Sequence, residues 1–401
     1  MNDKIIEEIK GKEKEVAELL VNIINIKAIS PLNGGNGELD RAKFIKKVLE
    51  QEGFSVKEYD YKDETNTIRP NLIVKYGSNS KTIWLVVHMD TVAEGDRSAW
   101  KTDPFKGIIN GDEIYGRGSV DNGQSLVASI YALKTIKGLG LKTKYNVGLA
   151  IVADEENGSA YGIQKVINEN IFKAGDLFLV PDWGDGKGDR IEVAEKGILW
   201  LKITVLGKQC HASTPQQGIN AYRYSINFLK KADELLHNKY KITNDIFDPN
   251  ISTFEMTKHD KNLENVNIIP GKEVTYMDCR VLPDYKLESI IKDLKDLADS
   301  EEFKKVKIIF ETLQKEEAAP ATSINSEIVK ILKSIIKEQY NIDAKEVGIG
   351  GGTCAAFFRR AGFDAIAWST SNDDEQAHQP NEHASIKSII NDAITFAHLY
   401  I

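Results

Sequence analysis

The architecture is indicated first by the run Ile83-Trp84-Leu85-Val86-Val87, which is followed at once by His88-Met89-Asp90. A continuous apolar run of strand length, without polar alternation, is typical of a strand that is covered on both faces of a sheet. In open α/β sheets, ligands collect beyond the carboxyl ends of such strands. We therefore expect a central strand that delivers His88 and Asp90 to a site at its end.

Short apolar runs and helical patterns alternate on both sides of this strand. Strand-like runs lie at residues 71–74, 145–152, 177–180 and 365–368, and helical patterns at residues 16–23, 39–52, 123–136 and 326–340. Strands that alternate with helices predict an α/β sheet that is at least partly parallel. We expect a mixed, mostly parallel sheet flanked by helices.

The middle of the chain has a different pattern. Residues 191–206 read as strand, turn and strand, residues 274–281 and 306–311 as strands, and residues 221–236 and 287–297 as helices. This order predicts a compact α+β unit inserted into a larger domain, and a chain of 401 residues is too long for one hydrophobic core. We expect a catalytic domain formed by residues 1–192 and 314–401, with residues 193–313 as the insertion.

Composition and charge exclude several classes of protein. The net charge is −8, from 60 acidic and 52 basic side chains, so the surface has no general attraction for nucleic acid or an anionic membrane. The first residues are acidic where a signal peptide is basic, and the apolar stretches are far too short to cross a bilayer. The three cysteines are widely separated, which fits thiols in a reducing compartment, and we expect a cytoplasmic protein.

Three successive acids, Asp154-Glu155-Glu156, follow the strand-like run at residues 145–152. Adjacent carboxylates in a partly buried place repel one another unless a cation neutralises them. A surface loop is the alternative, and the apolar run before it argues against that reading. Because adjacent side chains diverge, Glu155 and Glu156 can serve different purposes, one as a metal ligand and one as a group that moves protons.

Another acid, Asp121, lies among glycines in Gly116-Arg117-Gly118-Ser119-Val120-Asp121-Asn122-Gly123-Gln124. Glycines allow a tight, irregular backbone that can bring a carboxylate close to a ligand. Taken alone, the segment reads more readily as an Asn-Gly turn before a helix, with Asp121 as the helix cap.

Two weaker motifs complete the candidate ligands: Val180-Pro181-Asp182, after another strand-like run, and Ala377-His378-Gln379-Pro380-Asn381-Glu382. An aspartate after a strand is usually a turn residue, and a lone histidine is usually structural. Together, however, the motifs supply two imidazoles and three carboxylates as ligands, with two carboxylates to spare. That is the set needed by two zinc ions about 3.5–4 Å apart that share a bridging carboxylate.

In their order along the chain, these motifs resemble the metal-site motifs of the dinuclear zinc exopeptidases and amidohydrolases. That family includes succinyl-diaminopimelate desuccinylase, acetylornithine deacetylase, aminoacylase and glutamate carboxypeptidase. The resemblance covers nearly the whole chain and implies a zinc-exopeptidase-like fold with two zinc ions, for which cobalt or manganese can substitute. One departure is that the family often has a short step to Lys-Gly after the bridging acid, whereas this chain has Asn122-Gly123-Gln124.

The resemblance implies a role for each residue of the centre. Five residues correspond to metal ligands, with Asp121 as the bridge: His88, Asp121, Glu156, Asp182 and His378. Asp90 corresponds to the acid that orients and polarises His88. Glu155 corresponds to the general base that deprotonates the attacking water and later delivers the proton to the leaving amine.

The inserted unit resembles the family's small lid domain. His211, in Gly207-Lys208-Gln209-Cys210-His211-Ala212-Ser213, matches the histidine that typically reaches the partner subunit's active site and steadies the oxyanion. Taken alone, His211 reads as a surface histidine after a strand. The resemblance therefore implies a homodimer that forms through the lid.

Five residues match the family's substrate contacts: Asn267, Arg280, Gly351, Gly352 and Thr353. Arg280 suits a bidentate clamp on a substrate carboxylate, although such an arginine is more often part of an ion pair at a strand edge. The glycine run resembles a loop whose backbone amides approach that carboxylate. A nucleotide-binding loop is the rival, but the run lacks the Lys-Ser/Thr of a P-loop and the GxGxxG spacing.

These features predict metal-dependent hydrolysis of an amide bond by a zinc-activated water, in a small N-acyl amino acid of the desuccinylase or deacetylase type. A dipeptidase or carboxypeptidase stays open, and aspartate rather than glutamate at position 182 tilts the choice slightly toward peptides. A third reading is a catalytically silent, dimeric binding protein, which has no need of both Asp90 and Glu155. We expect no nucleic-acid or membrane partner.

Overall fold

The run that begins at Ile83 forms strand β3 (Thr82–His88), and every residue of this strand is buried. In the computed structural model, which describes residues 1–371 and 377–401, β3 lies between β6 and β7 and runs parallel to both. The predicted central strand is therefore confirmed. Its burial requires cover on both faces of the sheet, which the flanking helices provide.

The main sheet is mixed and mostly parallel at its centre, as predicted. Within the described residues it has eight strands in the order β1-β2-β6-β3-β7-β16-β8-β15, with antiparallel pairs at β1/β2, β2/β6 and β16/β8. The other strands are β1 (Val56–Lys62), β2 (Ile68–Tyr76), β6 (Asn146–Val152), β7 (Leu177–Asp185), β8 (Arg190–Glu195), β15 (Lys345–Ile349) and β16 (Asp364–Thr370).

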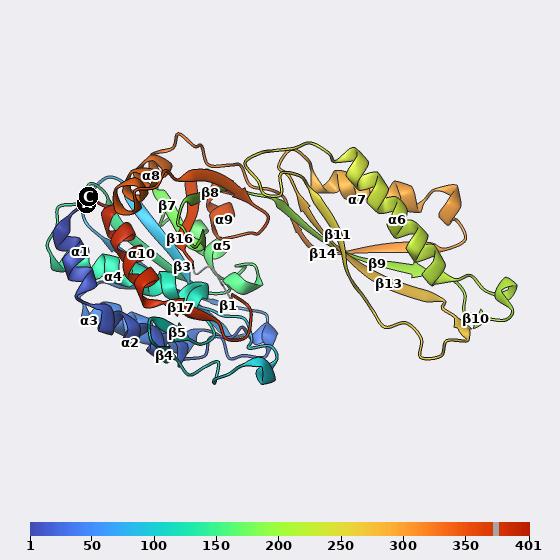
Figure 1. Cartoon of the computed structure of the whole chain (residues 1–401), viewed down its shortest axis with the longest axis horizontal. Helices are drawn as coiled ribbons and strands as arrows, with labels where there is room; N and C mark the ends of the chain where they lie inside the picture. Colours follow the sequence, from blue (N-terminus) through green and yellow to red (C-terminus); the bar gives the residue numbers. More distant parts are fainter. Residues whose placement is uncertain (372–376) are drawn as a thin grey trace. The chain divides into compact units, whose positions relative to one another are not determined.

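Helices pack on this sheet around two layers of apolar side chains. Trp84 and Val86 of β3 pack with Phe178 and Phe358 in a cluster rich in aromatic rings, while the alternating residues of β3 point to the other face. Figure 1 shows α10 beside α4, and these two helices contact each other and the sheet. The helices of this part are α1 (Asp3–Lys10), α2 (Glu13–Ile24), α3 (Leu39–Gln51), α4 (Ser125–Gly138), α5 (Ile163–Val166), α8 (Glu327–Tyr340), α9 (Ala355–Arg360) and α10 (Ile386–His398).

A small sheet brings two distant segments together. Strand β5 (Glu113–Tyr115) pairs with β4 (Ile108–Asn110) and with β17 (His383–Ser385), so that His383 lies opposite Tyr115. The segment that follows β5 contains Asp121, and the segment that precedes β17 contains His378. The pairing therefore sets these two motifs beside each other.

The chain divides into two compact units, one of Met1–Val193, Ala321–Val347 and Thr353–Ile401, the other of Ala194–Pro320 and Gly348–Gly352. The second boundary differs from the expected one at 313/314, because strand β14 continues to Glu316 and pairs there with Ile198. Gly348–Gly352 also fall in the second unit, where the carbonyl of Gly350 accepts a hydrogen bond from Arg280 at 3.0 Å. The glycine run was expected in the catalytic domain.

The second unit is a four-stranded antiparallel sheet, in the described residues, with two helices on one face. Its strand order is β11-β13-β9-β14, and a two-stranded sheet pairs β10 with β12. Strand β11 has no counterpart in the predictions, because Phe254 is its buried residue and the rest reads as polar loop. The elements are β9 (Gly197–Leu206), β10 (Cys210–His211), β11 (Thr253–His259), β12 (Ile268–Ile269), β13 (Lys272–Val281), β14 (Lys307–Glu316), α6 (Ala221–Lys239) and α7 (Leu287–Ala298).

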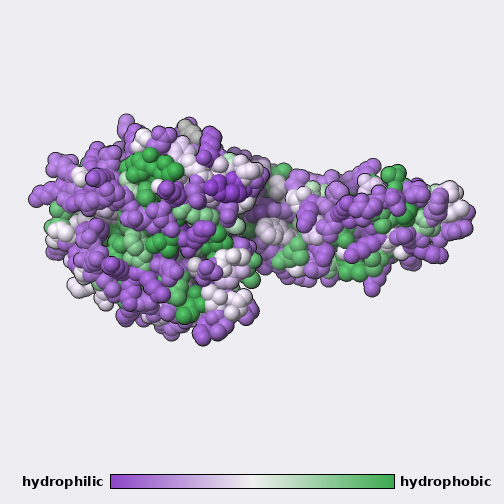
Figure 2. All heavy atoms as spheres, turned by 90° about the horizontal axis from the view of Figure 1, so that it is seen from below, coloured by the Kyte–Doolittle hydropathy of each residue, from purple (hydrophilic) through white to green (hydrophobic). Residues whose placement is uncertain are grey.

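The surface seen in Figure 2 is mostly hydrophilic, with separate hydrophobic patches. Among the helices of the described parts of the chain, none has the length and apolar content to cross a bilayer.

Candidate metal centre

The centre is built at the carboxyl ends of neighbouring parallel strands. His88 ends β3 opposite Val152 of β6, and the amide of Met89 donates to the carbonyl of Val152 at 2.9 Å. The turn that follows β6 carries Asp154, Glu155 and Glu156, so the strand pairing places it next to His88. The position of these residues follows directly from the parallel sheet.

Asp121 joins the two histidines of the centre. It lies in an irregular helical segment, Ser119–Gln124, and its own backbone angles are not helical. Its Oδ1 atom is 2.9 Å from Nε2 of His88, and its Oδ2 atom is 3.0 Å from Nε2 of His378. One carboxylate thus faces an imidazole on each side, which is the geometry of a bridge rather than of a helix cap.

The side chains form two groups that share Asp121. The first consists of His88, Asp121 and Asp182, and the second of Asp121, Glu156 and His378. In each group the candidate ligand atoms all lie within 4.8 Å of one another. All five residues that the sequence predicted as ligands are therefore together, and each group offers both nitrogen and oxygen donors.

The centre carries an excess of negative charge. Burial raises the pKa of Glu156 to about 7, and the nearby charge of Asp121 adds to this effect. Burial also raises the pKa of Asp182, and hydrogen bonds to Asp121 and Glu156 raise the pKa of His378 to about 10. Burial and the neighbouring charge of Asp121 thus disfavour the charged forms of Glu156 and Asp182, as expected where carboxylates gather for a cation.

The donor set fits divalent metal ions. In the part of the chain that the structure describes, no lysine or arginine forms an ion pair with Asp121, Glu156 or Asp182; their charged partners are the two histidines. Imidazole and carboxylate together suit zinc, cobalt or manganese. The shared carboxylate provides for two ions in adjacent positions.

Glu155 differs from the ligands in its placement. It directly precedes Glu156, but it belongs to neither ligand group. Burial raises the pKa of its carboxyl group well above the usual value, and the charge of Asp182 contributes. Glu155 is therefore a carboxyl group that lies beside the candidate ligands without belonging to either group.

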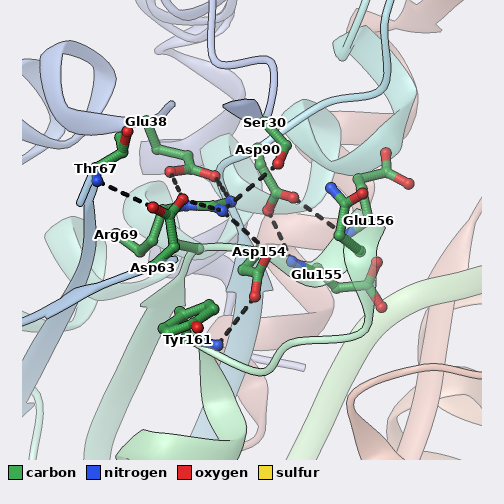
Figure 3. A network of polar contacts seen from close by, with 12 residues as sticks. Ser30, Glu38, Asp63, Thr67, Arg69, Asp90, Asp154, Glu155, Glu156 and Tyr161 are labelled. Atoms are coloured by element: carbon green, nitrogen blue, oxygen red, sulfur yellow. Dashed lines mark hydrogen bonds and ion pairs between the residues drawn. The ribbon is translucent and has the colours of Figure 1, made fainter. Parts of the chain in front are cut away.

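Asp90 contacts both His88 and the acidic turn. The Nδ1 atom of His88 is 3.1 Å from the backbone carbonyl of Asp90 and 3.5 Å from its Oδ1 atom. The two carboxylate oxygens of Asp90 accept the backbone amides of Glu155 and Glu156, each at 3.1 Å (Figure 3). The carboxylate of Asp90 therefore holds the acidic turn, and both its carboxylate and its backbone carbonyl face Nδ1 of His88.

Asp182 does not follow its strand but lies within it, because β7 continues to Asp185. Its Oδ1 atom is 3.3 Å from Nε2 of His88 and accepts a hydrogen bond from Asn122 at 2.6 Å. Asn122 stands where the family often has the step to lysine, so this departure supplies a contact to a candidate ligand.

Glu382 and Arg117 hold the loop of Asp121, and the sequence reasoning did not single them out. The buried carboxylate of Glu382 accepts hydrogen bonds from Arg117 at 2.7 Å and from the amides of Gly118, Val120 and Asp121 at 3.0–3.2 Å. Both residues stood inside quoted motifs, but their partners are mostly backbone amides, which no residue pattern reveals. Together they fix the loop that presents Asp121.

His211 and Asn267 belong to the second unit, where His211 lies in β10 and Asn267 directly precedes β12. His211 of β10 pairs with Ile268 of β12, and the carbonyl of Asn267 accepts the amide of Ala212 at 2.9 Å. The Nδ1 atom of His211 accepts the amide of Ser213 at 3.1 Å. A neutral His211 therefore carries its proton on Nε2, which is free to donate a hydrogen bond.

Arg280 is already engaged within the second unit. Its Nε and Nη2 atoms contact the two carboxylate oxygens of Asp278 at 2.7 and 3.0 Å, and Nη1 donates to the carbonyl of Gly350. The exposed Gly351 and Gly352 follow. Thr353 belongs to the first unit, and its hydroxyl accepts the amide of Ala355 at the start of α9.

Comparison with known proteins places these observations in a family. Residues 84–401 match the family described as peptidase family M20/M25/M40. An uncharacterized metallohydrolase of Methanocaldococcus jannaschii is 40% identical over 96% of this chain and 98% of its own length. A succinyl-diaminopimelate desuccinylase of Ehrlichia ruminantium is 26% identical over 92% of each chain.

Solved structures share the fold. A dipeptidase from Saccharomyces cerevisiae has a TM-score of 0.77 at 18% identity, covering 99% of this chain and 97% of its own. A metallo-carboxypeptidase of the M20 family from Sulfolobus solfataricus has a TM-score of 0.77 at 20% identity, covering 96% and 98%. A dinuclear metal-binding peptidase of the same family from Bacillus subtilis has a TM-score of 0.65 at 13% identity, covering 97% and 98%.

Proposed function

The chain belongs to peptidase family M20/M25/M40, whose members are metallohydrolases, and we propose that it hydrolyses the amide bond of a small N-acyl amino acid. The proposed bond lies next to a free carboxylate, as in desuccinylases and deacetylases. The observation that carries this proposal is the sharing of Asp121 by two ligand groups, with Glu155 beside them and in neither.

We propose that the residues of the first group, His88, Asp121 and Asp182, hold one zinc ion. Asp121, Glu156 and His378 hold the second, and cobalt or manganese can take the place of zinc. When bound, such ions lower the pKa of a water molecule and polarise the substrate carbonyl.

In the proposed reaction Glu155 transfers the proton. Its carboxylate takes a proton from the water whose oxygen attacks the amide carbon. As the carbon–nitrogen bond breaks, the same carboxyl group gives this proton to the leaving amine, so that the products are a carboxylic acid and an amine, which become a carboxylate and an ammonium group when the second proton of the water passes between them. Asp90 supports this step, because its carboxylate fixes the amide of Glu155 itself.

Residues of the second unit are proposed to recognise the substrate. None of Gly350, Gly351 and Gly352 has a positive φ, and a Cβ atom at each would meet no heavy atom of the described residues closer than 3.5 Å. The fold itself therefore does not require glycine at these positions, whereas close approach of a ligand carboxylate does. Asn267 and Arg280 are proposed as further contacts, and the Nε2 proton of His211 as a donor to the oxyanion.

A dipeptidase or carboxypeptidase is the second candidate. Two of the solved structures with this fold bear those names, and both cover nearly the whole chain. The same centre cleaves a peptide bond by the same proton transfers, so the difference lies in the acyl group alone.

We also propose a homodimer that forms through the second unit. Strand β14 ends the four-stranded sheet, and its Ile309 and Leu313 side chains are exposed. On α6, Tyr222 and Ile226 are about half exposed. An edge strand and an apolar helix surface of this kind suit association with a second copy. Light scattering of the chain and of Ile309→Lys tests this: a monomeric wild type contradicts it.

The function is tested by hydrolysis assays on protein loaded with zinc or cobalt and on the same protein after chelation. The substrates are succinyl-diaminopimelate, acetylornithine, N-acetyl amino acids, dipeptides and a folyl-glutamate mimic. Metal-dependent release of the amine from an N-acyl amino acid supports the proposal, and release from a dipeptide alone supports the second candidate. Absence of bound metal from protein incubated with either ion contradicts both.

A further inference from the structure

We propose that Arg69 is a positioning residue for the turn that carries Glu155 and Glu156, and that it acts through Asp154. The inference rests on the proposed function for the roles of the two glutamates, but its structural part can be measured independently of any substrate.

Arg69 lies in β2 with its side chain 1% exposed, among three carboxylates. Its Nε atom donates to Oε2 of Glu38 at 2.9 Å, and its Nη2 atom contacts the other oxygen of Glu38. Its Nη1 atom is 3.2 Å from Oδ1 of Asp154 and 3.5 Å from Oδ2 of Asp63 (Figure 3). One planar guanidinium thus connects helix α3, which starts after Glu38, with the residue that precedes Glu155.

Asp154, at the start of the acidic turn, accepts hydrogen bonds from backbone amides at its far end. The carboxylate oxygen that does not face Arg69, Oδ2, accepts a hydrogen bond from the amide of Tyr161 at 2.9 Å. The backbone carbonyl of Asp154 accepts a hydrogen bond from the amide of Ser159 at 2.6 Å. Its φ is +66°, a left-handed conformation that a residue other than glycine keeps only when its surroundings determine it. Because Glu155 is the next residue, a change in this conformation moves the carboxyl group of Glu155.

Strand β2 also contacts the turn through Asn71, two residues after Arg69. The Oδ1 atom of Asn71 accepts the amide of Ala153 at 3.1 Å, and its Nδ2 atom donates to the carbonyl of Tyr161 at 3.1 Å. β2 and β6 are antiparallel, and their register, continued past the end of β6, sets Arg69 level with Asp154. The contact therefore extends the sheet into the turn.

The positive charge of Arg69 stabilises the ionised form of the buried carboxylate of Glu38. Burial raises the pKa of Glu38 to about 7, and the hydrogen bond from Arg69 opposes this rise. Lysine at this position keeps the positive charge but lacks the planar guanidinium that contacts Glu38 and Asp154 at the same time. The variant Arg69→Lys therefore separates the effect of the charge from the effect of the geometry.

The alternative is that Arg69 only stabilises the fold, and Arg359 provides a matched control. Arg359 is also 1% exposed and forms a buried ion pair, with Glu192, and it donates to the carbonyl of Ala365 at 2.9 Å. The variants are therefore Arg69→Met, Arg69→Lys and Arg359→Met, each compared with the wild type.

We expect both methionine variants to lower the melting temperature, because each removes the guanidinium from a buried ion pair. Backbone amide hydrogen exchange, measured by mass spectrometry, should be faster than in the wild type in the peptide spanning residues 154–161 of Arg69→Met. In Arg359→Met the exchange of this peptide should be unchanged. In the metal-loaded enzyme, kcat and metal affinity should fall about 10–100-fold in Arg69→Met with KM changed little, and Arg69→Lys should recover only part of both.

Unchanged exchange in the 154–161 peptide of both Arg69 variants would overturn the inference, whatever the enzyme's substrate proves to be. Equal kcat and metal affinity in Arg69→Met and Arg359→Met would also overturn it, leaving Arg69 with a structural role. If Arg69→Met does not fold, Arg69→Lys and Asp154→Asn decide by the same measurements. A wild type that binds metal and cleaves no substrate contradicts the proposed function alone, because the exchange measurement still decides the role of Arg69.

Discussion

The carboxylate of Glu382 accepts a hydrogen bond from the backbone amide of Asp121 at 3.2 Å, across 261 residues of sequence. Asp121, whose carboxylate lies between the two imidazoles, is thus held through its backbone by the buried carboxylate of Glu382. Glu382 is itself held by Arg117, whose guanidinium also lies 5.2 Å from the ring centre of Trp100. The position of the bridging carboxylate therefore depends on a residue that is not a candidate ligand.

The first prediction concerns Glu382→Gln. Loss of the charge leaves Arg117 buried without its partner, and breaking such a pair costs about 3–5 kcal/mol of folding stability. The loop that presents Asp121 loses its anchor, so metal affinity should fall about 10–100-fold in competition with a chromophoric chelator. Glu192→Gln is the control, because it breaks another buried Arg–Glu pair. Equal metal affinities in the two variants would show that Glu382 serves stability alone.

The second prediction separates the two neighbouring glutamates. In Glu155→Gln, kcat should fall by about 10²–10⁴-fold while the metal content stays near that of the wild type, since Glu155 belongs to neither ligand group. In Glu156→Gln, bound metal should be lost, because that residue is in the second group. Elemental analysis by mass spectrometry and a turnover assay measure both. A fully active Glu155→Gln would remove this residue from the mechanism.

The third prediction concerns pH and Asp392 of α10. Its carboxyl group accepts hydrogen bonds from Thr370 and Gln124, but burial raises its pKa to about 7. The folded chain therefore binds a proton that the unfolded chain releases near pH 4, and this contribution to stability is lost as pH rises toward 7. The free energy of unfolding should fall with pH by an amount on the order of a few kcal/mol.

Asp392→Asn should remove this part of the pH dependence. Urea unfolding of chelated wild type and variant at pH 5 and pH 8 measures it, and the difference between the two proteins cancels the titration of all other groups. Parallel pH profiles would mean that Asp392 is ionised in the folded chain throughout.

The fourth prediction concerns substrate recognition. If Arg280 clamps a substrate carboxylate, Arg280→Ala should raise KM about tenfold or more with little change in kcat. Asp278→Asn should have the opposite tendency, because Asp278 occupies two nitrogens of the guanidinium in this structure. Steady-state kinetics on whichever substrate the hydrolysis assays identify decide this. An unchanged KM in Arg280→Ala would show that the arginine serves only the pair with Asp278.

Much of the first unit was predictable from local pattern. The buried run at residues 83–87 identified the central strand, and the apolar runs before Asp154 and Asp182 identified its neighbours β6 and β7. Polar edge strands such as β11 were not predicted, because a strand with one buried residue has no periodic pattern of apolar residues. The compact second unit reaches Pro320, beyond the expected end at residue 313, and β14 continues through the polar residues Gln314–Glu316, which carry no strand signal.

The sequence by itself determined the residue types that end each parallel strand, and a parallel sheet necessarily collects them at one edge. It also identified the family, because five separated motifs agree in order. Only the tertiary structure decided how those residues are held: Asp121 by Glu382, Glu155 and Glu156 by Asp90, and Asp154 by Arg69. These contacts use backbone amides and buried ion pairs between segments that are distant in the chain. Such contacts leave no local pattern, because a backbone amide is the same in nearly every residue and a buried acid resembles a surface acid until the chain has folded.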